Sequence, residues 1–370
     1  MKTGPEQWAN RAASAEAAIV RRHLRQLWRI PGTQLGVVGW PPSRRDRSYG
    51  TWHYWWQAHL LDTLVDAQLR DPRPERAERI RRQIRGHRIR NNGRWTNRYY
   101  DDMAWLALAL ERAGRLLGIA RPQALQTLTR QLFNSWMPEY GGGIPWRKQD
   151  QFFNAPANGP AGIVLARCGQ VPRAAQMADW IDRTLLDPET QLIFDGIRDG
   201  SLVRAQYTYC QGVVIGLETE LAVRTGDDRH APRARRLIAA VGEHLAPHGV
   251  LRGAGGGDGG LFAGITARYL ALAATDLPGD TKEDVAARAT ARGIVLASAK
   301  AAWDNRQTID GLPLFGAFWD QLAEVPPVGG GSARFVDGAV DASETPERDL
   351  SVQISGWMLM EAARAVTAAS

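Results

Sequence analysis

The sequence predicts an all-α fold, an (α/α)6 toroid or barrel of six helical hairpins. Three observations lead to this prediction. Segments of helical length are numerous and evenly spaced, they alternate between apolar and amphipathic character, and the linkers between them alternate between long and short. Almost no segment shows sustained period-two alternation, so we expect sheets to be minor at most.

About twelve segments have the length and residue types of helices. We expect them at about 8–28, 52–70, 74–88, 99–117, 122–136, 156–168, 173–186, 207–224, 229–246, 261–275, 281–300 and 349–367. Starting with the second, every other segment is apolar and aromatic, whereas the remaining ones are arginine-rich or charged on one face. An apolar helix is buried and an amphipathic one covers it, so the alternation predicts an inner and an outer ring.

The linkers support the same arrangement. Those that precede the apolar helices are long and rich in glycine, aromatic and polar residues, for example 139–158 and 195–206. Those that join an apolar helix to its amphipathic partner are short, such as 71–74. All long loops therefore lie at one end of the predicted barrel, where functional sites are usually built. No domain boundary is evident, and we expect a single domain over 1–370.

Composition excludes several classes of protein. Hydrophobic residues make up 44% and charged residues 23% of the 370 positions, which is typical of a globular protein. No run of 18 apolar residues is present, so no transmembrane segment is expected. The N-terminal residues lack the apolar region of a secretory signal, which predicts a cytoplasmic protein. Cys168 and Cys210 form no CxxC pair, and the seven histidines show no ligand spacing, so we expect no metal and no cofactor.

The net charge of +7 comes from arginine, which is dense between Arg70 and Arg90. A solvated outer helix with Ile80 and Ile84 on its buried side explains this run, and a GC-rich genome explains high arginine usage in general. An anion-binding surface is the alternative. No aromatic residues are interleaved with these arginines and no binding motif accompanies them, so we expect no nucleic-acid partner.

Two adjacent carboxylates open an apolar helix. Asp101 and Asp102 follow Tyr99 and Tyr100 and precede the apolar run 103–110. Aspartate at a helix start can serve only to cap the helix and to complement its dipole. Buried carboxylates are rare unless they are paired or functional. The aromatic residues around this pair favour a functional site.

The long loops and the helix starts beside them hold many tryptophan, asparagine and glutamine residues. The chain has 14 tryptophans, and aromatic walls with a few fixed polar groups suit a small polar ligand such as a sugar. Each tryptophan taken alone is better explained by packing, but the clustering favours a sugar-binding cleft. The predicted substrate-binding residues are Trp56, Gln57, Trp95, Tyr100, Trp146, Asn154, Asn158, Asp195, Tyr209 and Gln211.

A carboxylate pair in a sugar-binding cleft predicts glycoside hydrolysis, with one group as proton donor and the other as nucleophile or base. Adjacent Cα atoms lie about 3.8 Å apart. This spacing favours the separation of about 5–5.5 Å found in retaining enzymes over the larger inverting one. Neighbouring helical residues point away from each other, but at the first turn both side chains can reach one cleft.

These residues resemble glycoside hydrolase family 76, the α-1,6-mannanases, from about Trp52 to Val366. The motifs that carry the resemblance are Tyr99-Tyr100-Asp101-Asp102 with Ala104-Trp105-Leu106, Gly142-Gly143-Ile144 with Trp146, Asn154-Ala155, Asn158-Gly159, Phe194-Asp195-Gly196-Ile197, Tyr207-Thr208-Tyr209 with Gln211-Gly212, and Gln353 with Ser355-Gly356. The resemblance implies a toroid and a retaining endo-α-1,6-mannanase in which Asp101 is the nucleophile and Asp102 the acid/base.

The sequence departs from the family pattern at Cys210, where asparagine is frequent, and at Ala263, where lysine is frequent. The expected partner is α-mannan or a mannoside oligosaccharide. The missing signal and the basic charge together suggest that this mannoside is anionic or lipid-linked. The alternatives are a transglycosylase that uses the same glycosyl-enzyme intermediate, and a non-hydrolytic toroid that acts as a sugar epimerase or binds glycans.

Overall fold

The computed structural model describes residues 4–369. The chain divides into two compact units. Unit 1 consists of residues 1–94, 249–267 and 295–370, and unit 2 consists of residues 95–248 and 268–294. The prediction of a single domain over 1–370 stays a prediction.

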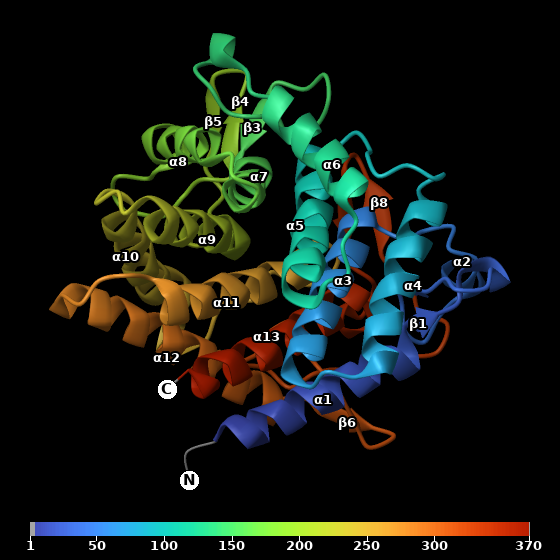
Figure 1. Ribbon diagram of the computed structural model, residues 1–370. Helices are drawn as coiled ribbons and strands as arrows, with labels where there is room; N and C mark the ends of the chain where they lie inside the picture. Colours follow the sequence, from blue (N-terminus) through green and yellow to red (C-terminus); the bar gives the residue numbers. More distant parts are fainter. Residues whose placement is uncertain (1–3, 370) are drawn as a thin grey trace. The chain divides into compact units, whose positions relative to one another are not determined.

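Unit 1 is built mostly from long helices, and its first helix packs on its last (Figure 1). Its helices are α1 (Pro5–Arg22), α2 (Arg44–Arg47), α3 (Tyr54–Arg70), α4 (Pro74–Arg90) and α13 (Leu350–Ala368), with the first part of α11 (Gly259–Asp276) and the last part of α12 (Lys282–Asp304). Helix α1 packs on α13, α13 packs on α3, and α3 packs on α4. The two ends of the chain therefore build one hydrophobic core.

Unit 2 holds successive helical hairpins, which Figure 1 shows in colours from teal through green to olive. They are α5 (Tyr100–Leu117), α6 (Pro122–Asn134), α7 (Ala155–Arg167), α8 (Val171–Leu185), α9 (Thr208–Thr225) and α10 (His230–Ala240). Helix α7 packs against α5, α8 and α9. Gly159 lets α9 approach α7, because a Cβ at this position would lie only 2.5 Å from Val213 Cγ2.

The predicted alternation of buried and covering helices is present in unit 2. Twelve of the thirteen residues of α7 and fourteen of the eighteen residues of α9 are buried. In α6 only three of thirteen residues are buried, namely Ala124, Leu128 and Leu132, at the i, i+4, i+8 spacing of one helix face. The apolar helices thus form the core, and the amphipathic ones cover it.

Strands are short, as the sequence predicts. They are β1 (Leu24–Arg25), β2 (Leu35–Gly36), β3 (Phe152–Asn154), β4 (Gly196–Arg198), β5 (Ser201–Val203), β6 (Gln307–Ile309), β7 (Leu312–Leu314), β8 (Arg334–Val336) and β9 (Ala339–Asp341). The β3–β4–β5 sheet is antiparallel, and it pairs Asn154 with Gly196. No helix among residues 4–369 is long and apolar enough to cross a membrane.

Two sequence expectations need correction. The first helix ends at Arg22 rather than near residue 28, because Leu24 and Arg25 form strand β1, which pairs with β2, and the positive φ angles of Trp28 and Arg29 (45° and 59°) then turn the chain. The arginine run is also not wholly solvated. The side chains of Arg70 and Arg76 are only 4% and 9% exposed and both bind Glu16. Ile80 and Ile84 lie on the buried side of α4, as expected.

Candidate functional site

The two adjacent aspartates lie in the first turn of α5, just before the helix enters the hydrophobic core. Tyr99 is the N-cap residue and its side chain makes no capping hydrogen bond. Asp101 and Asp102 are partly exposed, whereas the helix is buried from Met103 onward. The carboxylates therefore lie at the N-terminal end of the helix, where its dipole stabilises negative charge.

Each carboxylate is oriented by different donors. The Trp146 indole N–H donates to Asp101 Oδ2 over 2.9 Å, and the backbone N–H of Asp102 donates to Asp101 Oδ1 over 2.8 Å. The Asn97 amide donates to Asp102 Oδ2. Hydrogen bonds from N–H groups stabilise a carboxylate and fix its direction. The pair is thus chemically unequal, although its members are neighbours in the chain.

Asn97 is a site residue that the sequence reasoning missed. Its side-chain oxygen accepts from the backbone N–H of Tyr99 over 2.9 Å, which leaves the amide group to reach Asp102. This is the local turn that asparagine favours two residues before a chain reversal or helix start. The signal in the sequence is an asparagine two residues before the N-cap, in a loop whose aromatic residues are more conspicuous.

The loop that carries Trp146 is tied to the aspartates by backbone hydrogen bonds. The N–H of Tyr100 donates to the carbonyl of Trp146 over 2.8 Å, and the N–H of Trp146 donates to the carbonyl of Phe152 over 2.7 Å. Gly142 and Gly143 begin this loop at φ angles of 108° and 87°, which favour glycine. A Cβ at Gly143 would also lie 2.8 Å from the Trp180 ring.

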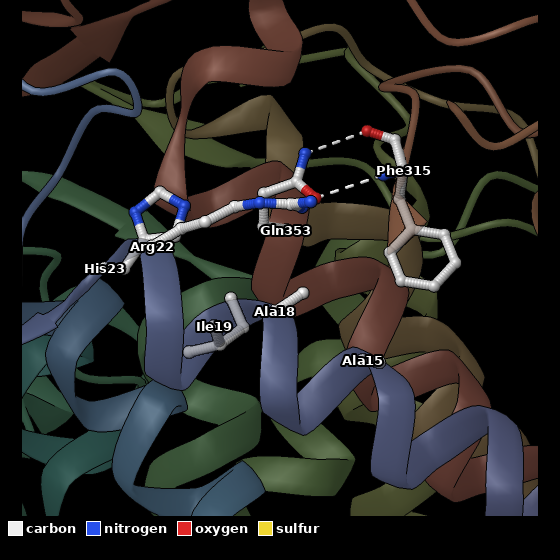
Figure 2. Close-up of a pocket in the computed structure, with 7 residues that line it drawn as sticks. All are labelled: Ala15, Ala18, Ile19, Arg22, His23, Phe315 and Gln353. Atoms are coloured by element: carbon white, nitrogen blue, oxygen red, sulfur yellow. Dashed lines mark hydrogen bonds between the residues drawn. The ribbon is translucent and has the colours of Figure 1, made fainter. Parts of the chain in front are cut away.

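Four buried amide side chains each bind both the N–H and the C=O of one loop residue, at 2.7–3.1 Å. We call this arrangement the amide clamp. The four pairs are Gln57 with Gly36, Asn158 with Ile144, Gln211 with Ile193, and Gln353 with Phe315. Figure 2 shows the last of them. Each clamp residue lies on an apolar helix and also donates to a carbonyl near the start of that helix.

The amide clamp changes the interpretation of three predicted substrate contacts. Gln57, Asn158 and Gln211 are all 0% exposed, and backbone groups occupy both their donors and their acceptors. Breaking such bonds would leave buried backbone groups without partners, which costs about 1–3 kcal/mol each. The structure therefore gives these residues a positioning role. Asn158 holds the loop that carries Trp146.

Trp56 lies in unit 1, and it too is 0% exposed. Its indole N–H donates to Asp258 Oδ1 over 3.2 Å, and the neighbouring Trp55 donates to the same oxygen over 2.9 Å. Removal from solvent raises the pKa of Asp258 to about 6. The ring of Trp56 is a core element, whereas that of Trp55 is partly exposed.

Asp195 lies at the end of the β3–β4–β5 sheet nearest Asn154. Its carbonyl accepts from the backbone N–H of Ala155, and its own N–H donates to the carbonyl of Ala205. The side chain is 9% exposed, and burial raises the pKa of this carboxyl to about 6. Cys210, which stands where the family often has asparagine, lies with its sulfur 3.7 Å from Asp195 Oδ1 and donates to it.

We expect Asp195→Asn to stabilise the protein in a pH-dependent way. The pKa of Asp195 is about 6 in the fold and 3.8 as the reference value, so the native protein loses stability as pH rises between these values. The neutral asparagine avoids this loss. The free energy of unfolding of the variant, measured by urea titration, should therefore exceed that of the parent by up to about 3 kcal/mol above pH 6. Asp199→Asn is the surface control, and a pH-independent difference for Asp195→Asn would contradict the prediction.

The remaining predicted residues lie as follows. Trp95, Tyr100 and Tyr209 are partly exposed at or near the starts of α5 and α9. Asn154 is the N-cap of α7, and its side-chain oxygen accepts from the Ala157 N–H. Sugar contact by these residues stays a prediction. Among residues 4–369 no group of three or more histidine, cysteine, aspartate or glutamate side chains is arranged to hold a metal ion.

Comparison with known proteins gives a consistent result. A family model described as glycosyl hydrolase family 76 matches residues 8–326. The structure of an α-1,6-mannanase from Salegentibacter sp. is 27% identical, with a TM-score of 0.79, and the alignment covers 97% of this chain and 99% of that one. A protein from Listeria innocua is 26% identical, with a TM-score of 0.77, and the alignment covers 96% of each chain. No curated protein sequence matches this chain.

A second structure of the Salegentibacter enzyme concerns its chemistry. It is an inactive variant, with two consecutive aspartates replaced by asparagine, in complex with α-1,6-mannotriose. It is 26% identical to this chain, with a TM-score of 0.80 and coverage of 97% and 99%. The prediction of an all-α fold of the α/α toroid class is confirmed by the helical content and by these similar structures.

Proposed function

This chain belongs to glycosyl hydrolase family 76, and we propose on that basis that it is a retaining endo-α-1,6-mannanase. The family supports glycoside hydrolase activity, and the similar α-1,6-mannanase structure suggests the linkage. The observation that carries the proposal is the pair Asp101 and Asp102 at the opening of α5, with separate hydrogen-bond donors. Two consecutive aspartates are also the residues replaced in the inactive relative.

In the proposed first step, a carboxylate oxygen of Asp101 attacks the anomeric carbon of a mannosyl unit. Asp102 gives its proton to the glycosidic oxygen while the bond from that oxygen to the anomeric carbon breaks. The Trp146 N–H and the Asp102 backbone N–H hold the Asp101 carboxylate in one direction. The products of this step are a mannosyl ester on Asp101 and the shortened mannan.

In the second step, Asp102 takes a proton from water and the water oxygen attacks the anomeric carbon. The ester bond to Asp101 breaks, and its carboxylate is regenerated along with the protonated Asp102. Two displacements at one carbon restore the original α configuration. Asn97 binds Asp102 in both steps and keeps the acid/base at the side of the leaving oxygen.

The proposal is tested by digesting linear α-1,6-mannan and following the first products by proton NMR. We expect internal cleavage to a ladder of oligosaccharides whose new reducing ends are initially α. Matched α-1,2- and α-1,3-linked mannans should remain intact. Initial β products would contradict the retaining mechanism, and preferential cleavage of another linkage would contradict the substrate.

We further propose that the physiological mannoside is anionic or lipid-linked and is met in the cytoplasm. The net charge of +7 supports its anionic character. The same digestion with phosphorylated oligomannosides addresses the substrate. At low salt we expect the phosphorylated oligosaccharide to be cleaved faster than the unmodified one. This difference should shrink when added salt screens the charges. Equal rates for the two substrates would count against an anionic substrate.

A further inference from the structure

Unit 1 carries a strongly basic surface that the glycosidase site does not use. We define the arginine surface by the exposed residues Arg25, Arg29, Arg44, Arg45, Arg47 and Arg85. None of the six forms an ion pair with a carboxylate within residues 4–369. No aspartate or glutamate occurs in 17–45 or in 79–100. The one acidic residue of α2, Asp46, is buried.

Direct contacts join the segments that carry these arginines. The Trp28 indole N–H donates to the carbonyl of Ser48 over 2.8 Å, which fixes the loop after β1 to the end of α2. The Tyr49 hydroxyl donates to the carbonyl of Arg25 over 3.1 Å. On the other side, the Gln34 N–H donates to the carbonyl of Arg82 over 3.0 Å and attaches the same loop to α4.

A small hydrophobic cluster joins the segments that carry this surface. Leu27, Leu35, Val37 and Tyr49 are buried together, with Trp52 and Ile89 packed against them. Arg85 lies beside Gly32, 3.7 Å from where a Cβ on that glycine would stand. One hydrophobic cluster therefore joins the loop, the end of α2 and α4, and Figure 1 shows these segments side by side.

The arginine surface has an apolar tip. Trp28 is 49% exposed although the adjacent Leu27 is fully buried. Both Trp28 and Arg29 have positive φ angles, a conformation that non-glycine residues adopt at a cost and that clusters at functional sites. Pro31 is exposed and Ile30 partly exposed beside them. A bulky aromatic ring is thus held outward, in a strained turn, among unpaired guanidinium groups.

We propose that the arginine surface docks this protein onto anionic lipid membranes, with Trp28 entering the interfacial layer. Guanidinium groups bind phosphate oxygens in pairs, and basic residues are attracted to the negative surface of anionic lipids. Tryptophan prefers the layer between headgroups and acyl chains, because it has both an apolar ring and a polar N–H. A nucleic acid fits less well, because a strand needs a series of stacking rings and this surface offers one exposed aromatic side chain.

The test is co-sedimentation of the full chain with vesicles of phosphatidylcholine alone or mixed with phosphatidylglycerol. We expect binding only to the anionic vesicles, and we expect it to fall when salt is raised well above about 0.1 M. Replacing Arg29, Arg44 and Arg45 together by glutamine should weaken binding about 100-fold, from roughly fivefold for each arginine. The matched control replaces the exposed Arg121, Arg130 and Arg183 of unit 2 and should change binding less than about twofold.

Trp28→Ala should weaken vesicle binding roughly tenfold while leaving the direct binding of a DNA duplex unchanged. Circular dichroism and thermal unfolding of each variant confirm that it is folded. Equal binding to neutral vesicles would overturn the proposal. So would full binding by the Arg29/Arg44/Arg45 variant, an equal loss in the matched control, or unchanged binding by Trp28→Ala.

Discussion

Asp101→Asn and Asp102→Asn are each expected to lower kcat/KM on α-1,6-mannan by about 10⁴-fold or more. Each variant keeps the shape of the side chain and removes either the attacking carboxylate or the proton donor. The measurement is the initial rate of reducing-end release from a defined α-1,6-mannotetraose. Asp276→Asn, at the exposed end of α11, is the matched control and should retain full activity. Wild-type rates in either site variant would remove the catalytic assignment.

The two variants should differ on a mannoside with an activated aryl leaving group. Such a group departs without a proton, so Asp102→Asn should still form the mannosyl ester and then accumulate it. Azide, which attacks without needing a base, should release that intermediate as α-mannosyl azide. Asp101→Asn should not respond in this way, because no ester can form. The opposite pattern would exchange the two roles.

A graded effect is expected from Trp146→Phe, which keeps an aromatic ring and removes the N–H that donates to Asp101. Hydrogen bonds to charged groups are worth about 1.5–3 kcal/mol, so kcat should fall roughly 10- to 100-fold with little change in KM. A loss confined to KM would show that Trp146 acts on substrate binding and not through Asp101.

Arg70→Leu is expected to lower the free energy of unfolding by about 3–5 kcal/mol, the typical cost of removing one partner of a buried ion pair and leaving the other. The Arg70 side chain is 4% exposed and binds Glu16 over 2.7 Å and Glu361 over 3.1 Å. Glu16 keeps Arg76 as a partner, whereas Glu361 keeps the Trp357 N–H. Urea titration monitored by circular dichroism measures the loss.

This destabilisation should depend on pH. Burial raises the pKa of Glu361 to about 7 from a reference value of 4.5, and Arg70 opposes that rise. Below about pH 5 Glu361 is protonated and neutral in the fold, so the positive charge of Arg70 stabilises it little. As pH rises through 7, Glu361 becomes a buried negative charge that Arg70 stabilises. The loss of unfolding free energy in Arg70→Leu should therefore be larger at pH 8 than at pH 5.

Arg73→Leu is the matched control for Arg70→Leu. Arg73 binds Asp71 over 2.7 Å, but its side chain is 61% exposed, and exposed ion pairs contribute about 0–1 kcal/mol. A similar loss in both variants, or a loss in Arg70→Leu that does not change with pH, would show that Arg70 does not stabilise the buried charge of Glu361.

Much of the fold follows from local sequence. Helix α5 was predictable because residues 103–110 are good helix formers with no glycine or proline. The amphipathic α6 followed from its apolar residues spaced four apart. The end of α1 at Arg22 was not predictable, because Leu24 and Arg25 leave the helix to pair with Leu35 and Gly36, and propensity alone favours continuing the helix.

The candidate site was predictable in part. The aspartate pair stood out because two charged residues directly precede the apolar run 103–110 of one helix. Gln57, Asn158 and Gln211 stood out as polar residues in otherwise apolar helices, but the structure uses them as amide clamps on backbone groups 14–21 residues away in the chain. For Gln353 the separation from Phe315 is 38 residues. A buried amide looks the same in the sequence whether it binds a ligand or a loop.

The sequence by itself determined which segments are helical, which helices are buried, and where the two aspartates lie, since these depend on periodicity and on neighbours along the chain. Only the tertiary structure decided the partners of buried polar groups. It made Asn97 a hydrogen-bond donor to Asp102, Trp146 a donor to Asp101 and Cys210 a donor to Asp195. It also paired Arg70 with both Glu16 and Glu361. The physical reason is that a buried polar group needs some partner, but the chain path selects which one.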